Sequence, residues 1–272
     1  MSRLPLPADW LVPDWPAPPG VRAVCTTRSC PAGDAPSAAP WGGFNLADHV
    51  GDAPQAVASH RAALAACTGA RPVFLKQMHG CHVAELDAYA PDGQPADAAV
   101  TASSGVACTV MVADCLPVLL ARADGAAVAA AHAGWRGLAG GVIEAAAQAV
   151  RRLGPHPPAS AASATSAVEV VAWLGPCIGP DAFEIGPEVR AAFTAAHPEA
   201  AACFTPRPGG KWLAHLPALA CQRLAALGIP AWGNDGSPVW CTFSQPQLFH
   251  SYRARPVTGR IAACVWLARG ES

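Results

Sequence analysis

The sequence predicts a mixed α/β fold in one domain, and three observations support this prediction. The chain has 272 residues, which is long enough to bury a large core. Apolar segments of strand length are interleaved with segments that have helical spacing. We find no internal repeat. We therefore treat residues 1–272 as a single domain, with residues 1–20 as an N-terminal extension.

The N-terminal part begins with a predicted strand at residues 21–27, followed by a loop rich in Gly, Pro and Ala at residues 29–43. Residues 54–67 predict a helix, because a proline suits the first turn and the spacing is helical. Two short strands follow at residues 72–78 and 81–87. Only the dipeptide HG separates them, which indicates a hairpin with the histidine at its tip.

The middle of the chain contains three apolar segments of strand length, at residues 105–113, 116–121 and 125–131. They lack polar alternation, which is typical of central strands that are buried on both faces. A helix is expected at residues 138–153, and Gly154 ends it.

Residues 155–167 have the composition of a linker, but an apolar strand at residues 168–175 follows at once. We therefore interpret residues 155–167 as a surface insertion and not as a domain boundary. Two more helices at about 186–196 and 216–227, and a final strand at 260–268, complete the mixed α/β domain.

Composition excludes several classes of protein. A net charge of −1 with 14% charged residues is too balanced and too sparse for an electrostatic nucleic-acid binder. The N-terminus does not have the pattern of a signal peptide, and no apolar stretch is long enough for a membrane span. Eleven cysteines in a chain of this kind indicate reduced thiols, so we expect a cytoplasmic protein.

Three polar residues lie where apolar strands meet turns, which is a common place for sites on α/β scaffolds: His79, Cys115 and His132. Two imidazoles and one thiolate are suitable ligands for zinc. Three protein ligands leave a fourth tetrahedral position open, as in catalytic zinc sites, and a water there becomes a nucleophile near neutral pH.

The spacing of these residues does not by itself specify a metal site, because it matches no CxxC or HExxH pattern. Two turn histidines and a small buried thiol fit the same pattern. Cys81 and His82 are further potential ligands, and on a strand only one of them faces the site. The nine histidines include no His-x-His pair, which argues against a multicopper oxidase.

A cysteine hydrolase is an alternative that uses the same atoms. Cys115 and His132 can form a thiolate–imidazolium pair, with Asp114 orienting the histidine. Metal content discriminates between the two hypotheses.

Seven motifs occur in order along the chain: FNLADHVGD, KQMHG, ADCLPVLL, HAGWRGLAGGVIEA, GPCIGPDAFEIGPEV, CT and SYRARPVTGR. Together they resemble the YfiH-like family, which is also called the laccase-domain, multifunctional purine nucleoside phosphorylase or peptidoglycan-editing-factor family. The resemblance covers residues 21 to 267, and the pair ADCLPV and HAGWRG is its most specific part.

The resemblance implies a single α/β domain with mixed β-sheets flanked by helices, similar in architecture to toxin deamidases. It implies that His79, Cys115 and His132 are both zinc ligands and catalytic residues. The implied activities are phosphate-dependent cleavage of adenosine, inosine and methylthioadenosine, and hydrolytic deamination of adenosine. An older assignment in the family is a copper polyphenol oxidase, so copper is the second candidate metal after zinc.

We expect purine nucleosides and phosphate as the partners of a monomeric protein. Arg61, Arg136 and Arg253 are candidate phosphate ligands, and Asn45 and His49 are candidates for contacts with ribose or base. Hydrogen bonds within loops are the alternative role for these residues.

A third hypothesis is a non-catalytic zinc protein that acts in peptidoglycan precursor editing. It requires a closed site with four protein ligands, in which Cys81 or His82 supplies the fourth.

Overall fold

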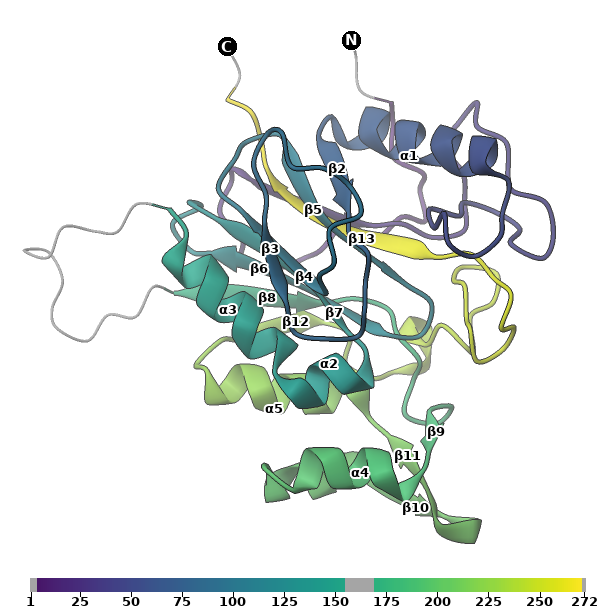
Figure 1. The fold of residues 1–272 in the computed structure, drawn as a ribbon, viewed down its shortest axis with the longest axis vertical. Helices are drawn as coiled ribbons and strands as arrows, with labels where there is room; N and C mark the ends of the chain where they lie inside the picture. The colour runs from purple at the N-terminus through teal and green to yellow at the C-terminus, as the bar shows by residue number, and fades with distance from the viewer. Residues whose placement is uncertain (1–3, 155–168, 271–272) are drawn as a thin grey trace, which may run out of the picture.

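The computed structural model describes residues 4–154 and 169–270, and two β-sheets packed face to face form its centre (Figure 1). Helices cover the outer face of each sheet, so the molecule is layered helix, sheet, sheet, helix. This arrangement confirms the predicted mixed α/β fold. The expected insertion at residues 155–167 lies outside the described residues.

The first sheet has the strand order β1-β13-β5-β2. Its strands are β1 (Val21–Cys25), β13 (Ile261–Leu267), β5 (Val106–Val112) and β2 (Arg71–Phe74). The first three are antiparallel neighbours, whereas β2 runs parallel to β5. Helix α1 (Pro54–Thr68) covers the outer face and buries Leu64 there beside Phe74.

The second sheet has the order β12-β8-β6-β7-β4-β3. Its strands are β12 (Ala231–Gly233), β8 (Val170–Leu174), β6 (Leu116–Arg122), β7 (Val128–Ala133), β4 (Ala98–Thr101) and β3 (Val83–Glu85). Its outer face packs against helices, with α3 and α5 across it: α2 (Trp135–Gly140), α3 (Val142–Arg152) and α5 (Leu216–Ala226).

A small third sheet stands below this helical layer, beside α4 (Pro187–Thr194). Its strands are β10 (Phe204–Arg207), β11 (Lys211–Ala214) and β9 (Glu184–Ile185). Three short 3-10 helices complete the described elements: η1 (Pro198–Cys203), η2 (Pro208–Gly210) and η3 (Pro238–Trp240).

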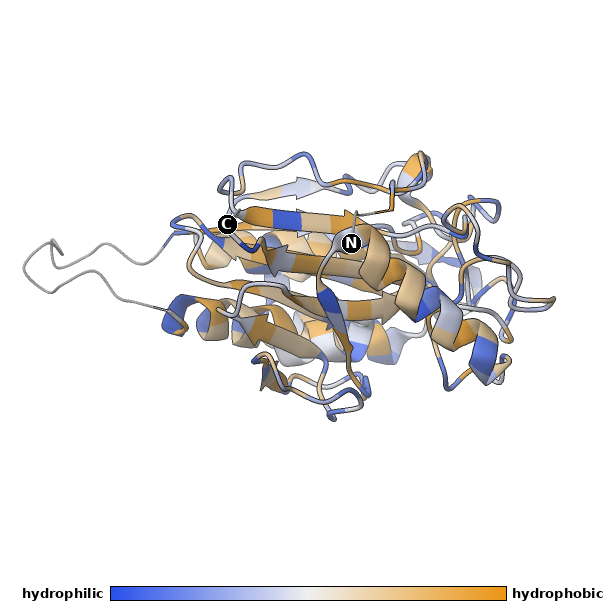
Figure 2. Ribbon diagram, turned by 90° about the horizontal axis from the view of Figure 1, so that it is seen from above, coloured by the Kyte–Doolittle hydropathy of each residue, from blue (hydrophilic) through white to orange (hydrophobic). Residues whose placement is uncertain are grey.

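Strand β6 shows why the central segments are apolar without alternation. Leu119 packs into the core between the two sheets, whereas Val118 and Leu120 pack toward the outer helices. Successive side chains of a strand point to opposite faces, and here both faces are covered. Figure 2 is consistent with this packing, because apolar residues predominate in the central strands, whereas hydrophilic residues are more frequent in the loops. The prediction of strands buried on both faces is therefore confirmed.

The predicted hairpin with His79 at its tip is wrong. β2 belongs to the first sheet and β3 to the second, so residues 75–82 cross between sheets. At this crossing, the backbone N–H groups of Met78, His79 and Gly80 donate to the Asp97 carboxylate.

The predicted helix at 138–153 is two helices. The first begins earlier than expected, at Trp135, and the break falls at Gly141. Gly141 has φ 98°, a left-handed conformation that glycine adopts without the cost a side chain brings. Its N–H caps α2 by donating to the carbonyls of Gly137 and Leu138.

Within the described residues, no helix is both long and apolar enough to cross a membrane.

We predict that Leu119→Ala lowers the free energy of unfolding by about 2–5 kcal/mol, because its fully buried side chain fills the space between the two sheets. Urea denaturation should show a lower midpoint with an unchanged slope. Tyr89→Ala is the control, since this side chain is 92% exposed and its loss should change stability by less than about 0.5 kcal/mol. Equal effects of the two substitutions would contradict the packing described here.

Candidate metal centre

Two segments cross between the sheets at the same end of the molecule. Residues 75–82 connect β2 to β3, and residues 113–115 connect β5 to β6. β2 is parallel to β5, so the C-terminal ends of both strands lie at the same end of the first sheet. The C-terminal end of β7 lies beside the start of β6, because the two strands are antiparallel and pair Ala133 with Leu116. Three strand ends therefore converge on one point.

The two crossings contain the two non-glycine residues with positive φ among the described residues, His79 at 60° and Asp114 at 91°. Such conformations cost about 1–3 kcal/mol and persist where surrounding contacts enforce them. Asp114 is held by its own carboxylate, which accepts hydrogen bonds from the Thr242 hydroxyl at 2.6 Å and the Arg253 backbone N–H at 2.6 Å.

The crossings and the end of β7 bring His79, Cys115 and His132 together. One potential ligand atom from each residue lies within 4.8 Å of the others. Cys115 Sγ is 3.8 Å from His79 Nε2, and the two imidazole rings meet edge to face with centroids 4.7 Å apart. Tetrahedral bonds of ordinary zinc length place a sulfur and a nitrogen ligand roughly 3.6 Å apart. The donor set and its spacing therefore fit a zinc ion.

Asp97 holds His79 and His132 in position through hydrogen bonds, and it was not identified from the sequence. Its carboxylate is 1% exposed and accepts the backbone N–H groups of Met78, His79 and Gly80 at 2.7–3.0 Å. It also accepts Nδ1–H of His132 at 2.8 Å. Nε2 of His132 is thereby left as the nitrogen that can bind a metal.

Electrostatics in the cluster favour charged groups. Burial acts to raise the pKa of Asp97, but hydrogen bonds from His132 and from backbone N–H groups outweigh it and lower the pKa. Burial alone would also raise the pKa of Cys115, yet the charge and hydrogen bond of His132, with a smaller contribution from His79, lower it. Conversely, burial would lower the pKa of His132, but Cys115 and Asp97 raise it. A thiolate is the form that metals bind.

Gly134, the residue before α2, leaves the space that the cluster occupies. A Cβ atom at this position would lie 2.8 Å from Cδ2 of His79 and 3.0 Å from Sγ of Cys115. Its φ of −63° is open to any residue, so the backbone conformation does not require glycine. Glycine is required here because His79 and Cys115 lie too close to leave room for a side chain.

A cavity of about 470 Å³ opens at the cluster. Its apolar walls are Met111, Trp135, Ile178, Phe183 and Leu216, and its polar walls outside the cluster include His49, Gln77, Arg136, Tyr252, Arg253 and Arg260. A concave, mostly apolar pocket with a few convergent polar groups is typical of a small-molecule site.

Three of the expected substrate-binding residues line this cavity: His49, Arg136 and Arg253. The Arg136 guanidinium stacks 4.3 Å from the ring of Trp135, so both residues form one wall. Arg253 is fixed by a hydrogen bond of 3.0 Å to the Glu184 carbonyl.

The other two expected residues lie elsewhere. Asn45 is fully buried, and its amide holds a loop together by accepting the Arg260 N–H at 2.9 Å and donating to Asp52 at 2.8 Å. Arg61 donates to the Leu46 carbonyl and lines a neighbouring cavity. The structure thus brings neither side chain to the metal cluster.

Asp114 does not orient His132, because Asp97 occupies that position. Cys81 and His82 also stay outside the three-residue cluster, and the Cys81 thiol contacts the Gly137 carbonyl at 3.5 Å. Arg260 and Tyr252 are cavity residues that the sequence did not single out as site residues; the motif SYRARPVTGR contained both of them.

The family model for multi-copper polyphenol oxidoreductase laccase matches residues 22–268. The chain belongs to this family, which includes the YfiH proteins. The YfiH purine nucleoside phosphorylase of Escherichia coli is 41% identical, with 94% of this chain and 98% of the relative covered. A purine nucleoside phosphorylase of Pseudomonas aeruginosa is 46% identical over 95% of this chain and 98% of the relative.

Solved structures of the YfiH family have the same fold. A Neisseria meningitidis protein of family DUF152 superposes with a TM-score of 0.84 at 42% identity, covering 96% of this chain and all of that one. YlmD from Geobacillus stearothermophilus superposes with a TM-score of 0.81 at 24% identity, covering 99% and 100% of the two chains, and supports the fold alone.

We predict that Asp97→Asn weakens Zn²⁺ binding by about 10- to 100-fold, as is usual for residues that orient metal-binding histidines. An amide has one oxygen, so the N–H groups now bound to the second carboxylate oxygen lose their acceptor. Competition with a chromogenic chelator measures the affinity. Asp235→Asn is the matched control, because its carboxylate accepts a backbone N–H from Ser237 and does not line the metal cavity. An unchanged affinity in Asp97→Asn would refute the orienting role.

Gly134→Ala should lower Zn²⁺ affinity at least about tenfold, since the new methyl group displaces His79 or Cys115 from its position. The overall fold should survive, because the backbone conformation at this residue suits alanine. Gly20→Ala is the control, since a Cβ there meets no atom within 4 Å. Circular dichroism and the same chelator competition check both variants, and a Gly134→Ala protein with normal affinity would contradict the proposed crowding.

Proposed function

We propose that this protein is a zinc-dependent purine nucleoside phosphorylase that also deaminates adenosine. The substrates are adenosine, inosine and methylthioadenosine with phosphate, and the products are the free base and the sugar 1-phosphate. The observation that carries the proposal is the cluster of two histidines and one cysteine at the base of a cavity with arginines in its walls. Relatives at 41–46% identity that are named purine nucleoside phosphorylases support it.

His79, Cys115 and His132 would hold the zinc ion, with the sulfur and one nitrogen already 3.8 Å apart. Zinc at this position supplies a Lewis acid and activates water near neutral pH. Asp97 keeps the proton of His132 on Nδ1, and its hydrogen bonds to the backbone fix the loop of His79. Three protein ligands leave room for a substrate atom, which a closed structural site would not.

Phosphorolysis requires that phosphate attack C1′ of the ribose while the bond from C1′ to the purine breaks. Arg136, Arg253 and Arg260 supply positive charge around the cavity for the phosphate. Arg253 and Arg260 are positioned by hydrogen bonds from their guanidinium groups to backbone carbonyls. The rings of Trp135 and Phe183 offer flat apolar surfaces against which the purine can stack.

Deamination requires attack of water at C6 of adenine and loss of ammonia, a reaction that zinc sites in other deaminases perform. Within one cavity, the adenine of bound adenosine would face the metal for deamination, whereas the ribose would face the phosphate for phosphorolysis. Deamination thus requires the base to lie beside the metal, and phosphorolysis requires the ribose to lie beside the phosphate.

All eleven cysteines are free thiols, and seven of them are buried. Thiols in this number persist in a reducing compartment, so we assign the protein to the cytoplasm. Copper is the alternative metal, since the family is described as a copper oxidoreductase. Two histidines and one cysteine suit either ion, so metal analysis decides.

A cysteine hydrolase is the second candidate function. The contacts from Asp97 to His132 and the lowered pKa of the Cys115 thiol match the arrangement of an activated cysteine nucleophile. This candidate requires the thiol to be free of metal during turnover.

We expect the purified protein to contain about one zinc ion per chain and to release adenine from adenosine only when phosphate is present. Without phosphate, adenosine should be converted only to inosine and ammonia, and hypoxanthine should appear once phosphate is added. Cys115→Ser should lose at least about a hundredfold in both activities together with its zinc, because a ligand is removed. Cys221→Ser is the control, since this thiol is exposed and lies outside the cavity. Metal-free protein that is fully active, and inactivated by thiol alkylation, would replace the proposal with the cysteine hydrolase.

A further inference from the structure

A second cavity of about 520 Å³ adjoins the metal cavity and has no role in the function proposed above. The two cavities share His49 and Gln77 as lining residues. Gln77 is fixed, because its amide makes two hydrogen bonds with the backbone of Met111, at 2.7 and 2.8 Å. The His49 side chain is 60% exposed, so it is the more movable of the two dividing residues.

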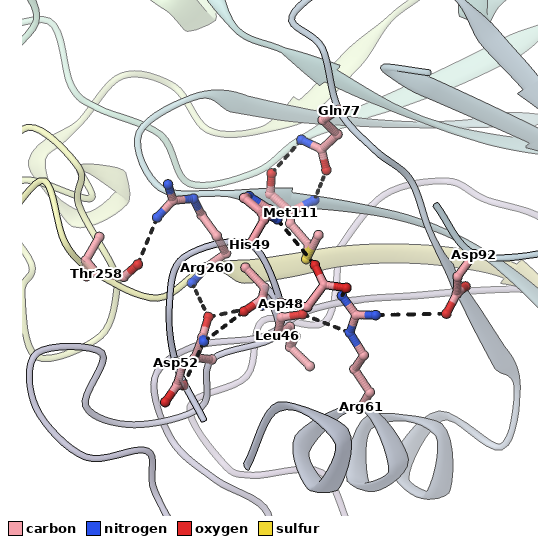
Figure 3. A network of polar contacts seen from close by, with 12 residues as sticks. Leu46, Asp48, His49, Asp52, Arg61, Gln77, Asp92, Met111, Thr258 and Arg260 are labelled. Carbon is pink, nitrogen blue, oxygen red and sulfur yellow. Dashed lines mark hydrogen bonds and ion pairs between the residues drawn. The ribbon is translucent and has the colours of Figure 1, made fainter. Parts of the chain in front are cut away.

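Charges of both signs line the second cavity (Figure 3). The Arg61 guanidinium lies between two carboxylates, 3.2 Å from Asp48 and 3.9 Å from Asp92. It stacks 4.1 Å from the Phe74 ring, and its Nε donates to the backbone at 3.0 Å, so its position is well defined. Lys76 lines the same cavity and makes no ion pair within residues 4–154 and 169–270.

Formal charges in this cavity cancel, since two cations face two carboxylates. A dianion such as a phosphate is a poor fit, because Asp48 and Asp92 repel it and already neutralise Arg61. A zwitterion is a good fit. Its carboxylate can pair with Lys76, and its ammonium group can pair with Asp48 and Asp92. Apolar contacts from Phe74 and Met78 suit a methylene or thioether chain between the charges.

We propose that the second cavity binds an α-amino-acid zwitterion attached through a thioether to C5′ of the nucleoside, as in S-adenosylhomocysteine. The adenosine part occupies the metal cavity, and the amino-acid tail passes between His49 and Gln77. This inference rests on the proposed nucleoside phosphorylase function and specifies a further substrate class for the same site.

The reaction follows the same bonds as for the smaller nucleosides. Phosphate attacks C1′, a C1′–O bond forms, and the bond from C1′ to N9 breaks. The purine leaves with the electron pair and takes up a proton, which releases adenine and a 5-thioether ribose 1-phosphate that retains the amino acid. No oxidant or reductant is needed.

Equilibrium binding tests the inference without turnover. S-inosylhomocysteine and 5′-methylthioinosine share a base that is already deaminated, and neither can undergo phosphorolysis in phosphate-free buffer. Isothermal titration of the zinc-loaded protein should give S-inosylhomocysteine at least about tenfold tighter binding, because its two charged groups gain partners that the methyl group lacks. Inosine 5′-monophosphate should bind no better than 5′-methylthioinosine.

Two variants locate the effect. Asp92→Asn and Lys76→Gln should each reduce the preference for S-inosylhomocysteine about fivefold or more, since one partner charge is lost in each. The Asn side chain can still accept the Phe74 N–H that Asp92 accepts at 2.9 Å, so the loop is kept. Asp87→Asn is the matched control, because its carboxylate accepts the Tyr89 N–H at 2.8 Å outside the cavity and should leave the preference unchanged.

Equal binding of S-inosylhomocysteine and 5′-methylthioinosine would overturn the inference and leave the proposed function standing. A preference that persists in both variants, or tighter binding of inosine 5′-monophosphate, would also overturn it. If neither inosine nor 5′-methylthioinosine binds, the proposed function itself fails. Steady-state assays with S-adenosylhomocysteine and methylthioadenosine should show the same ratio in kcat/KM.

Discussion

The candidate metal centre depends on one buried carboxylate, that of Asp97. It binds three consecutive backbone N–H groups of the loop that contains His79 and the Nδ1–H group of His132. A buried carboxylate is costly unless it is hydrogen-bonded, and these four donors meet that requirement. One residue therefore sets the position of one ligand, the tautomer of another and the left-handed backbone at His79.

The arrangement of the sheets explains why the ligands meet at this point. β2 and β5 belong to one sheet, whereas β3 and β6, the strands that follow them, belong to the other. The chain therefore crosses from one sheet to the other after β2 and after β5. His79 and Cys115 lie on the two crossings, and His132 lies at the end of β7 beside them. Gly134 then lets the chain turn into α2 without filling the space. The core between the sheets supports His79 and Cys115, which lie on loops, and His132, which lies in β7.

Patterns within short stretches of sequence correctly predicted the central strands. Continuous apolar segments gave the central strands, because burial on both faces leaves no place for polar residues. The same reasoning placed His79, Cys115 and His132 at strand ends, where the structure brings them together. The hairpin prediction was wrong because the sheet that a short strand joins is decided by distant partners. Asp97 was missed because a single aspartate before a four-residue strand looks like any loop residue.

The positions of the arginine side chains also could not be predicted from local sequence. Arg61 and Arg253 were both candidate phosphate ligands, but Arg61 lies between carboxylates in the second cavity, whereas Arg253 lines the metal cavity. Side-chain direction depends on contacts with residues distant in sequence, so residue type alone did not separate them. The break at Gly141 had a local signal in the paired glycines at 140 and 141, which the prediction of one continuous helix did not use.

X-ray absorption spectroscopy of the purified protein at the zinc edge tests whether His79, Cys115 and His132 bind zinc. We expect one sulfur ligand at about 2.3 Å and three nitrogen or oxygen ligands at about 2.0–2.1 Å, two of them with the scattering pattern of imidazole. The sulfur contribution should disappear in Cys115→Ser. A protein without bound metal, a shell with no sulfur, or a shell with two or more sulfurs would contradict the centre formed by His79, Cys115 and His132.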